Sequence, residues 1–163
     1  MWREHPHRVV PEDVLRIGAI EAARLKRLVL IAPAGFGAEI GDGFLAGMLE
    51  AKDSAAIKTI MAELGGEPAS DVVAEQALTR IAQHREQLAA MILEFQDAGW
   101  QSHSILDTIA KLKAPVTAIF GRNDTIISAH HAINAPRNVE LRFTTTGGHV
   151  PHWADPAFIA SLV

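Results

Sequence analysis

The chain of 163 residues contains no cysteine. Disulfide bonds, thiolate zinc sites and cysteine nucleophiles are therefore excluded from its chemistry. A protein without cysteine is compatible with a reducing cytoplasm, and we expect a cytoplasmic location. The first residues are polar and lack the apolar segment of a secretory signal peptide, which agrees with that expectation.

A strong charge of either sign is also missing. Fifteen basic and 19 acidic residues give a formal net charge of -4. Neither an excess of positive charge nor a basic stripe with interleaved aromatic residues is present, so we expect no nucleic acid partner. The longest apolar stretches hold about five to seven residues, whereas a membrane-spanning helix needs roughly 20. We therefore expect no membrane partner either.

The patterns that could suggest a cofactor or a metal are weak. Gly35-x-Gly37 and Gly41-x-Gly43 lack the rest of the dinucleotide-binding fingerprint and are more typical of turns. His149-x-x-His152 falls on an expected loop, without the helical setting of a zinc-binding histidine pair. We expect no cofactor and no metal site.

Two short apolar runs predict strands of a parallel sheet. They are Leu28–Ala32, which is followed by proline and glycine, and Val116–Phe120. Continuous apolar runs of this length are typical of strands that are buried on both faces. Val139–Phe143 instead alternates apolar and charged residues, which predicts a half-covered strand at the edge of the sheet.

The remaining patterns are helical and complete a single α/β domain. Residues 1–11 are expected to form an arm, residues 12–40 and 104–163 the sheet and its flanking helices, and residues 41–103 a helical insertion. The insertion shows apolar stripes at helical spacing and no strand pattern. One stripe expected to face the core consists of Val72, Val73, Ala77, Leu78 and Ile81. Hydrophobic residues make up 48% of the chain, enough for one sizeable core. Alternation of strands and helices predicts about three parallel strands joined by right-handed crossovers.

Two residues follow the carboxyl ends of predicted strands, the side of a parallel sheet where ligands bind in such folds. Asp124 comes after the second strand and His149 after the third. A histidine oriented by a carboxylate is the acid–base part of a catalytic triad. Each residue alone has another interpretation, since Asp124 could only close a turn and His149 could be structural. Their joint occurrence after neighbouring strands favours catalysis.

Three segments resemble the carboxyl-terminal part of the α/β-hydrolases. They are Leu28–Gly37 (LVLIAPAGFG), Ala114–Ile127 (APVTAIFGRNDTII) and Asn138–Pro156 (NVELRFTTTGGHVPHWADP). A narrower resemblance, in LIAPAGFGAEI and NDTIIS, is to the hydrolase-type domain of the acetoin-cleaving dihydrolipoyl acetyltransferases. The resemblance implies a partial α/β-hydrolase fold with Asp124 as triad acid, His149 as triad base and residues 41–103 as an α-helical cap.

The sequence departs from that family at the nucleophile. The family carries its serine on a Gly-x-Ser-x-Gly turn between a strand and a helix, and no such motif occurs in this chain. The counterparts of the earlier strands and of the oxyanion-hole donors are missing as well. The chain therefore resembles a truncated or diverged hydrolase.

A small-molecule substrate is expected to bind beneath the cap. Phe36, Trp100, Val150 and Trp153 are the candidate substrate-binding residues, because apolar side chains near the catalytic edge can line such a pocket. Core packing is the alternative interpretation for each of them.

Three hypotheses for function remain open. The chain could be an ester, acyl or carbon–carbon bond hydrolase, or an acyltransferase-associated domain, whose nucleophile is water or a group of another chain. It could be a non-catalytic binding or assembly module that forms homo-oligomers by burying the exposed edge of its sheet. It could also be a fragment of a longer hydrolase.

Overall fold

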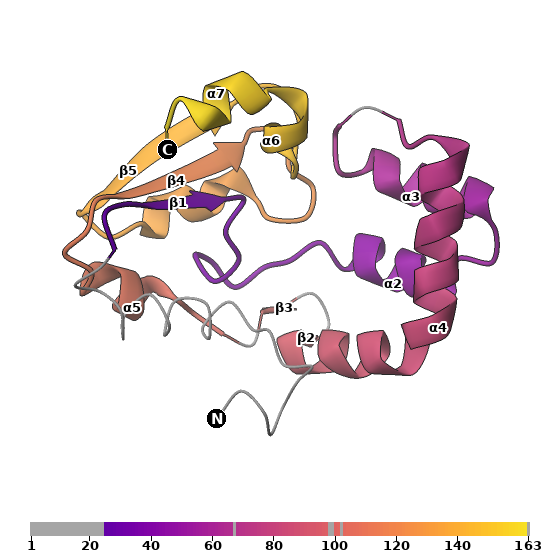
Figure 1. Cartoon of the computed structure of the whole chain (residues 1–163). Coiled ribbons are helices and arrows are strands. Elements are labelled where there is room, and N and C mark those ends of the chain that lie inside the picture. Colours follow the sequence, from indigo (N-terminus) through magenta and orange to yellow (C-terminus); the bar gives the residue numbers. More distant parts are fainter. Residues whose placement is uncertain (1–24, 67, 98–99, 102, 163) are drawn as a thin grey trace.

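The computed structural model describes residues 25–66, 68–97, 100–101 and 103–162 (Figure 1). The predicted arm over residues 1–11 lies outside the described residues, and so do residues 12–24 of the predicted sheet and flanking helices.

Within the described residues, three parallel strands form the main sheet, as predicted. The strands are β1 (Leu28–Ile31), β4 (Val116–Gly121) and β5 (Val139–Thr144), in the order β1-β4-β5. Leu28 pairs with Val116, and Val116 with Val139, so the three strands start level with one another. All six residues of β4 are buried, as expected for the middle strand.

The prediction that the first strand is buried on both faces is wrong within the described residues. All four residues of β1 are only half-buried. The cause is the strand order, because β1 lies at one edge of the sheet and β4 takes the central place. An apolar run indicates that a strand can be buried, but it does not determine which neighbour covers it.

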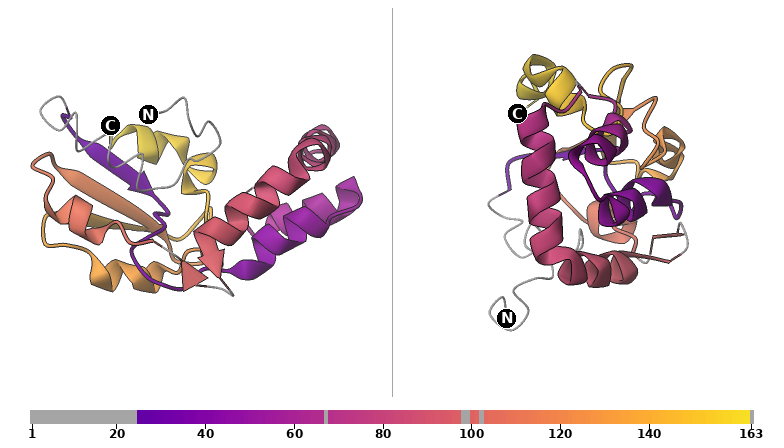
Figure 2. Two further views of the ribbon diagram at one scale, coloured as in Figure 1. Left: turned by 90° about the horizontal axis from the view of Figure 1, so that it is seen from below. Right: turned by 90° about the vertical axis from the view of Figure 1, so that its right-hand side faces the viewer.

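Helices cover the two faces of the sheet. Figures 1 and 2 show α5 (Leu106–Ala110) on one side and α6 (Pro151–Ala154) with α7 (Pro156–Ala160) on the other. Phe120 of β4 points into the main core, where its ring contacts that of Phe36 edge-on at 5.6 Å between centroids. The other buried members of this core are Ile105, Ile109, Leu112, Val116, Ala118 and Ala132.

The segment between β1 and α5 is a helical insertion that stands to one side of the sheet (Figures 1 and 2). It consists of α2 (Asp42–Glu50), α3 (Ser54–Ala62) and α4 (Asp71–Phe95). The three helices enclose a small core of their own, whose buried members are Ala51, Ile57, Ala74 and Ile81.

Side-chain caps explain where two of these helices begin. Asp53 accepts a hydrogen bond of 2.8 Å from the backbone N–H of Ala56 at the start of α3. Ser70 accepts one of 3.3 Å from the N–H of Val73 at the start of α4.

Two expectations for the insertion are wrong. A short antiparallel hairpin of β2 (Gln96–Asp97) and β3 (Trp100–Gln101) follows α4, where no strand was expected. Strands of two residues are too short to show an alternating pattern. Val72 and Val73 are 61% and 45% exposed instead of facing the core, because the first turn of α4 directs Ala74, and not these two valines, into the core of the insertion.

A kink also divides α4 into two parts. His84 has non-helical backbone angles, with φ of -124° and ψ of 21°. The apolar stripes on either side of His84 therefore belong to two differently directed segments. A single helical period over residues 71–95 does not describe both of them.

Candidate active site

The turn after β4 holds the carboxylate of Asp124 inside the protein. Its side chain is 1% exposed. One carboxylate oxygen, Oδ1, accepts hydrogen bonds from the backbone N–H groups of Ile126 at 2.8 Å and Ile127 at 2.9 Å. Asp124 therefore closes a turn, as one interpretation of the sequence held, and its second oxygen is free for another partner.

The loop after β5 brings His149 to that second oxygen. His149 Nδ1 lies 2.9 Å from Asp124 Oδ2, and the His149 side chain is 26% exposed. Gly148, with φ of +46°, lets this loop turn tightly. A Cβ on Gly121 would lie 1.9 Å from the Gly148 carbonyl oxygen, so the end of β4 must be glycine for the loop to approach.

This geometry gives the imidazole a defined chemical capacity. With Nδ1 donating its proton to the carboxylate, Nε2 carries the lone pair and can accept a proton. A buried carboxylate also stabilises the imidazolium that forms on proton transfer. The structure thus brings the predicted pair together, and their catalytic role remains a prediction.

The comparisons with solved structures identify the fold. The chain superposes on 2-hydroxy-6-oxo-6-phenylhexa-2,4-dienoate hydrolase from Rhodococcus sp. strain RHA1 with a TM-score of 0.74 and 15% identity, over 94% of this chain and 59% of that one. An α/β-hydrolase enzyme from a Medee basin deep-sea metagenome gives a TM-score of 0.66 and 15% identity, over 93% and 59%. The described residues form part of an α/β-hydrolase fold. The partial fold predicted from sequence is therefore confirmed.

A sequence relative points to the narrower resemblance. The dihydrolipoyllysine-residue acetyltransferase component of the acetoin cleaving system from Pseudomonas putida is 28% identical over 142 residues, which cover 83% of this chain and 37% of the relative. The chain thus spans about a third of that relative and about three-fifths of the two solved hydrolases. No family model matches the sequence.

The candidate substrate-binding residues of this α/β-hydrolase fold are not in one common environment. Phe36 is wholly buried in the main core, and Val150 is 6% exposed in a second apolar cluster. Trp100 and Trp153 are 57% and 55% exposed. Phe36 and Val150 thus show the core packing that was the alternative interpretation, whereas both tryptophans are accessible to a ligand.

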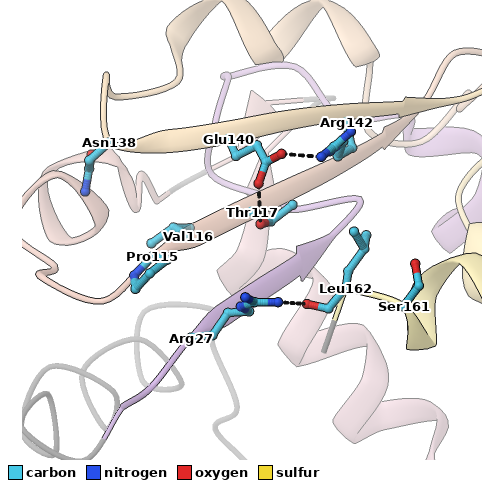
Figure 3. Close-up of a pocket in the computed structure, with 9 residues that line it drawn as sticks. All are labelled: Arg27, Pro115, Val116, Thr117, Asn138, Glu140, Arg142, Ser161 and Leu162. Atoms are coloured by element: carbon cyan, nitrogen blue, oxygen red, sulfur yellow. Dashed lines mark hydrogen bonds and ion pairs between the residues drawn. The ribbon is translucent and has the colours of Figure 1, made fainter.

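A cavity of about 350 Å³ lies near the starts of the strands (Figure 3). Asp124 and His149 instead follow the strand ends. Arg27 reaches across it and donates a hydrogen bond of 2.7 Å to the carbonyl oxygen of Leu162. Glu140 forms an ion pair with Arg142 on its wall. The remaining lining residues are Pro115, Val116, Thr117, Asn138 and Ser161. None of the six candidate site residues lines this cavity.

Sequence reasoning missed a set of polar contacts that holds the loop after β1. Gln101 accepts a hydrogen bond of 2.7 Å from the N–H of Gly35 and donates to the carbonyl oxygens of Gly37 and Glu39. The buried ring of His131 lies with Nε2 3.0 Å from the Glu39 carboxylate. Contacts across 62 to 92 residues leave no local pattern in a sequence, so only the fold reveals them.

Among the described residues, the histidine and carboxylate side chains form no group of three or more that could hold a metal ion. No helix in the described part of the chain is both long and apolar enough to cross a membrane.

The surroundings of Glu39 lead us to predict that the stability of the protein falls at acid pH. A hydrogen bond from its own backbone N–H, together with one from His131, lowers the pKa of Glu39 below its usual value. A carboxyl with a lowered pKa contributes stability that is present above its unfolded value of about 4.3 and lost as the pH falls through the folded value. We expect Glu39→Gln to reduce the free energy of unfolding at about pH 7, and this deficit to shrink as the pH falls below about 4.3 and to vanish below the lowered pKa of Glu39 in the folded state. Urea unfolding across that range measures it, and a deficit independent of pH would contradict the assignment.

Proposed function

We propose that this chain acts as an α/β-hydrolase-type catalytic domain in which Asp124 and His149 form the acid–base pair. The substrate class is a small molecule with an ester or related acyl bond, or with a carbon–carbon bond next to a carbonyl. The observation that carries the proposal is the 2.9 Å contact between His149 Nδ1 and the buried Asp124 carboxylate. The fold shared with solved hydrolases supports it.

The reaction follows from the capacity of the pair. For an ester, His149 Nε2 accepts a proton from a water molecule as the water oxygen attacks the carbonyl carbon. The tetrahedral intermediate then breaks its bond to the leaving alcohol, which takes the proton back from the imidazolium. We assign water as the nucleophile for this chain alone, because its sequence contains no Gly-x-Ser-x-Gly turn. Attack by a group of another chain would give acyl transfer instead, the class of reaction in the name of the acetoin-system relative.

Hydrolysis of p-nitrophenyl acetate tests this proposal. A positioned general base contributes typically 10²–10⁴-fold, so we expect a rate about 10²-fold or more above buffer. His149→Ala should remove most of that excess. His130→Ala is the matched control, since His130 is exposed and its side chain does not contact Asp124. A wild-type rate equal to that of buffer, or an equal loss in both variants, would remove the proposal.

Self-association is a second candidate function, favoured by the edges of the sheet. Leu141 and Phe143 of β5 are 37% and 45% exposed, and β1 is half-buried at the opposite edge. Exposed strand edges with apolar side chains favour pairing with a second copy. Light scattering coupled to size exclusion is expected to give a dimer or larger species. A stable monomer at every concentration tested would contradict this candidate.

A further inference from the structure

The end of α3 lies directly against both loops of the acid–base pair. We call residues 63–66 the α3 end segment. The carbonyl oxygen of Leu64 accepts a hydrogen bond of 2.8 Å from the backbone N–H of His149. The carbonyl oxygen of Glu63 accepts one of 3.3 Å from the hydroxyl of Thr125, the residue after Asp124. Two adjacent residues of the helical insertion thus bind the loop of the acid and the loop of the base.

Two glycines make this close approach possible. Gly65 has a φ of +76°, and a Cβ there would lie 2.9 Å from the Cα of Gly148. A Cβ on Gly148 would in turn lie 2.7 Å from the carbonyl oxygen of Leu64. Atoms that are not bonded do not pack so closely, so a side chain at either glycine would separate the two segments.

Apolar side chains also pack between the α3 end segment and the two loops of the acid–base pair. Leu64 is 7% exposed and belongs to a buried cluster with Ile126 and Ile127, which follow Asp124, and with Val150, which follows His149. The two isoleucines are also the residues whose N–H groups bind the Asp124 carboxylate. The cluster therefore ties the α3 end segment to the backbone that orients the carboxylate.

We propose that the α3 end segment positions His149 for its contact with Asp124, so that the helical insertion controls the geometry of the acid–base pair. Leu64 and Gly65 are positioning residues, because they contact the loop of His149 and not a reacting group. When the segment moves away, the His149 N–H loses its acceptor, the loop of the base is released and the ring leaves the carboxylate. The catalytic consequence rests on the function proposed above, whereas the geometric claim does not.

Hydrogen exchange of the whole protein tests this inference with Gly65→Ala. We expect the backbone amide of His149 to exchange at least tenfold faster in the variant, while the amides of β4 keep their rates. The Nδ1 proton of His149, whose NMR signal lies far downfield when it is bonded to a carboxylate, should lose intensity. A general loss of stability would instead accelerate the amides of His149 and β4 by one common factor.

Gly35→Ala is the matched control for backbone strain. Gly35 also has a positive φ, of +84°, but a Cβ there would meet Ile105 at 3.1 Å, not the loop of His149. This variant should leave the Nδ1 proton signal of His149 intact. An unchanged Nδ1 signal in Gly65→Ala, or the same acceleration at His149 and in β4, would overturn the proposal.

A second variant keeps the test decisive if Gly65→Ala does not fold. Thr125→Val removes the hydroxyl that binds the carbonyl oxygen of Glu63 and keeps the shape of the side chain. If the exchange of the His149 amide is accelerated relative to the wild type by a larger factor than the exchange of the β4 amides, the result supports the proposal. The same factor at both places contradicts it. Neither readout depends on turnover, so an absence of esterase activity would remove the proposed function and leave this result standing.

Discussion

Asp124→Asn is expected to remove most of the His149-dependent hydrolysis, roughly a hundredfold or more, while the protein keeps nearly all of its stability. The asparagine carbonyl oxygen can still accept the two N–H groups of Ile126 and Ile127 that the carboxylate binds. Its amide group, however, presents N–H donors where His149 Nδ1 finds an acceptor in the wild type. The imidazole must then carry its proton on Nε2, and Nε2 can no longer act as a base.

Asp124→Ala separates the structural role of this side chain from the catalytic one. The alanine leaves the N–H groups of Ile126 and Ile127, which are buried, without their acceptor. Each unsatisfied buried donor costs about 1–3 kcal/mol, so the two together lead us to expect a loss of about 2–6 kcal/mol in the free energy of unfolding. Urea unfolding of both variants checks the structural role of the carboxylate, and ester hydrolysis by both variants checks its catalytic role. Equal stability of the alanine and asparagine variants would contradict the role assigned to Oδ1.

Phe120→Ala is expected to cost about 3–5 kcal/mol in the free energy of unfolding, the usual range for a phenylalanine removed from a packed core. The Phe120 side chain is fully buried on the middle strand and contacts the rings of Phe36 and Phe143. A domain has only about 5–15 kcal/mol of stability, so this single change removes a large part of it.

Phe143→Ala is the matched control for that prediction. Phe143 pairs with Phe120 in the register of β4 and β5, but its side chain is 45% exposed at the edge of the sheet. We expect it to cost about 1 kcal/mol, in the range of an ordinary substitution. Urea unfolding of both variants measures the difference. Similar losses would show that the core is not centred on β4.

The positions of the three strands could be predicted from the sequence because each strand left a local pattern. The apolar runs of β1 and β4 and the alternation of apolar and polar residues in β5 are local patterns that indicate strands. The contact between Asp124 and His149 could be predicted from topology. Neighbouring parallel strands end at the same edge of the sheet, and each residue follows one such end.

The features that escaped prediction depend on contacts between distant segments. The edge position of β1 depends on which strand pairs with it, and a run such as Leu28–Ile31 carries no such information. The hairpin of β2 and β3 is too short for a pattern. The α3 end segment reaches His149 across 85 residues of sequence, and no local periodicity reports that hydrogen bond.

The tautomer of His149 tests the central claim most directly. Nitrogen NMR of the protein labelled in its histidines, recorded at a pH where the ring is neutral, distinguishes a proton on Nδ1 from one on Nε2. We predict that His149 carries its proton on Nδ1 in the wild type and loses this preference in Asp124→Ala. A neutral His149 with its proton on Nε2 in the wild type would show that the carboxylate does not orient the ring, and it would contradict the acid–base pair.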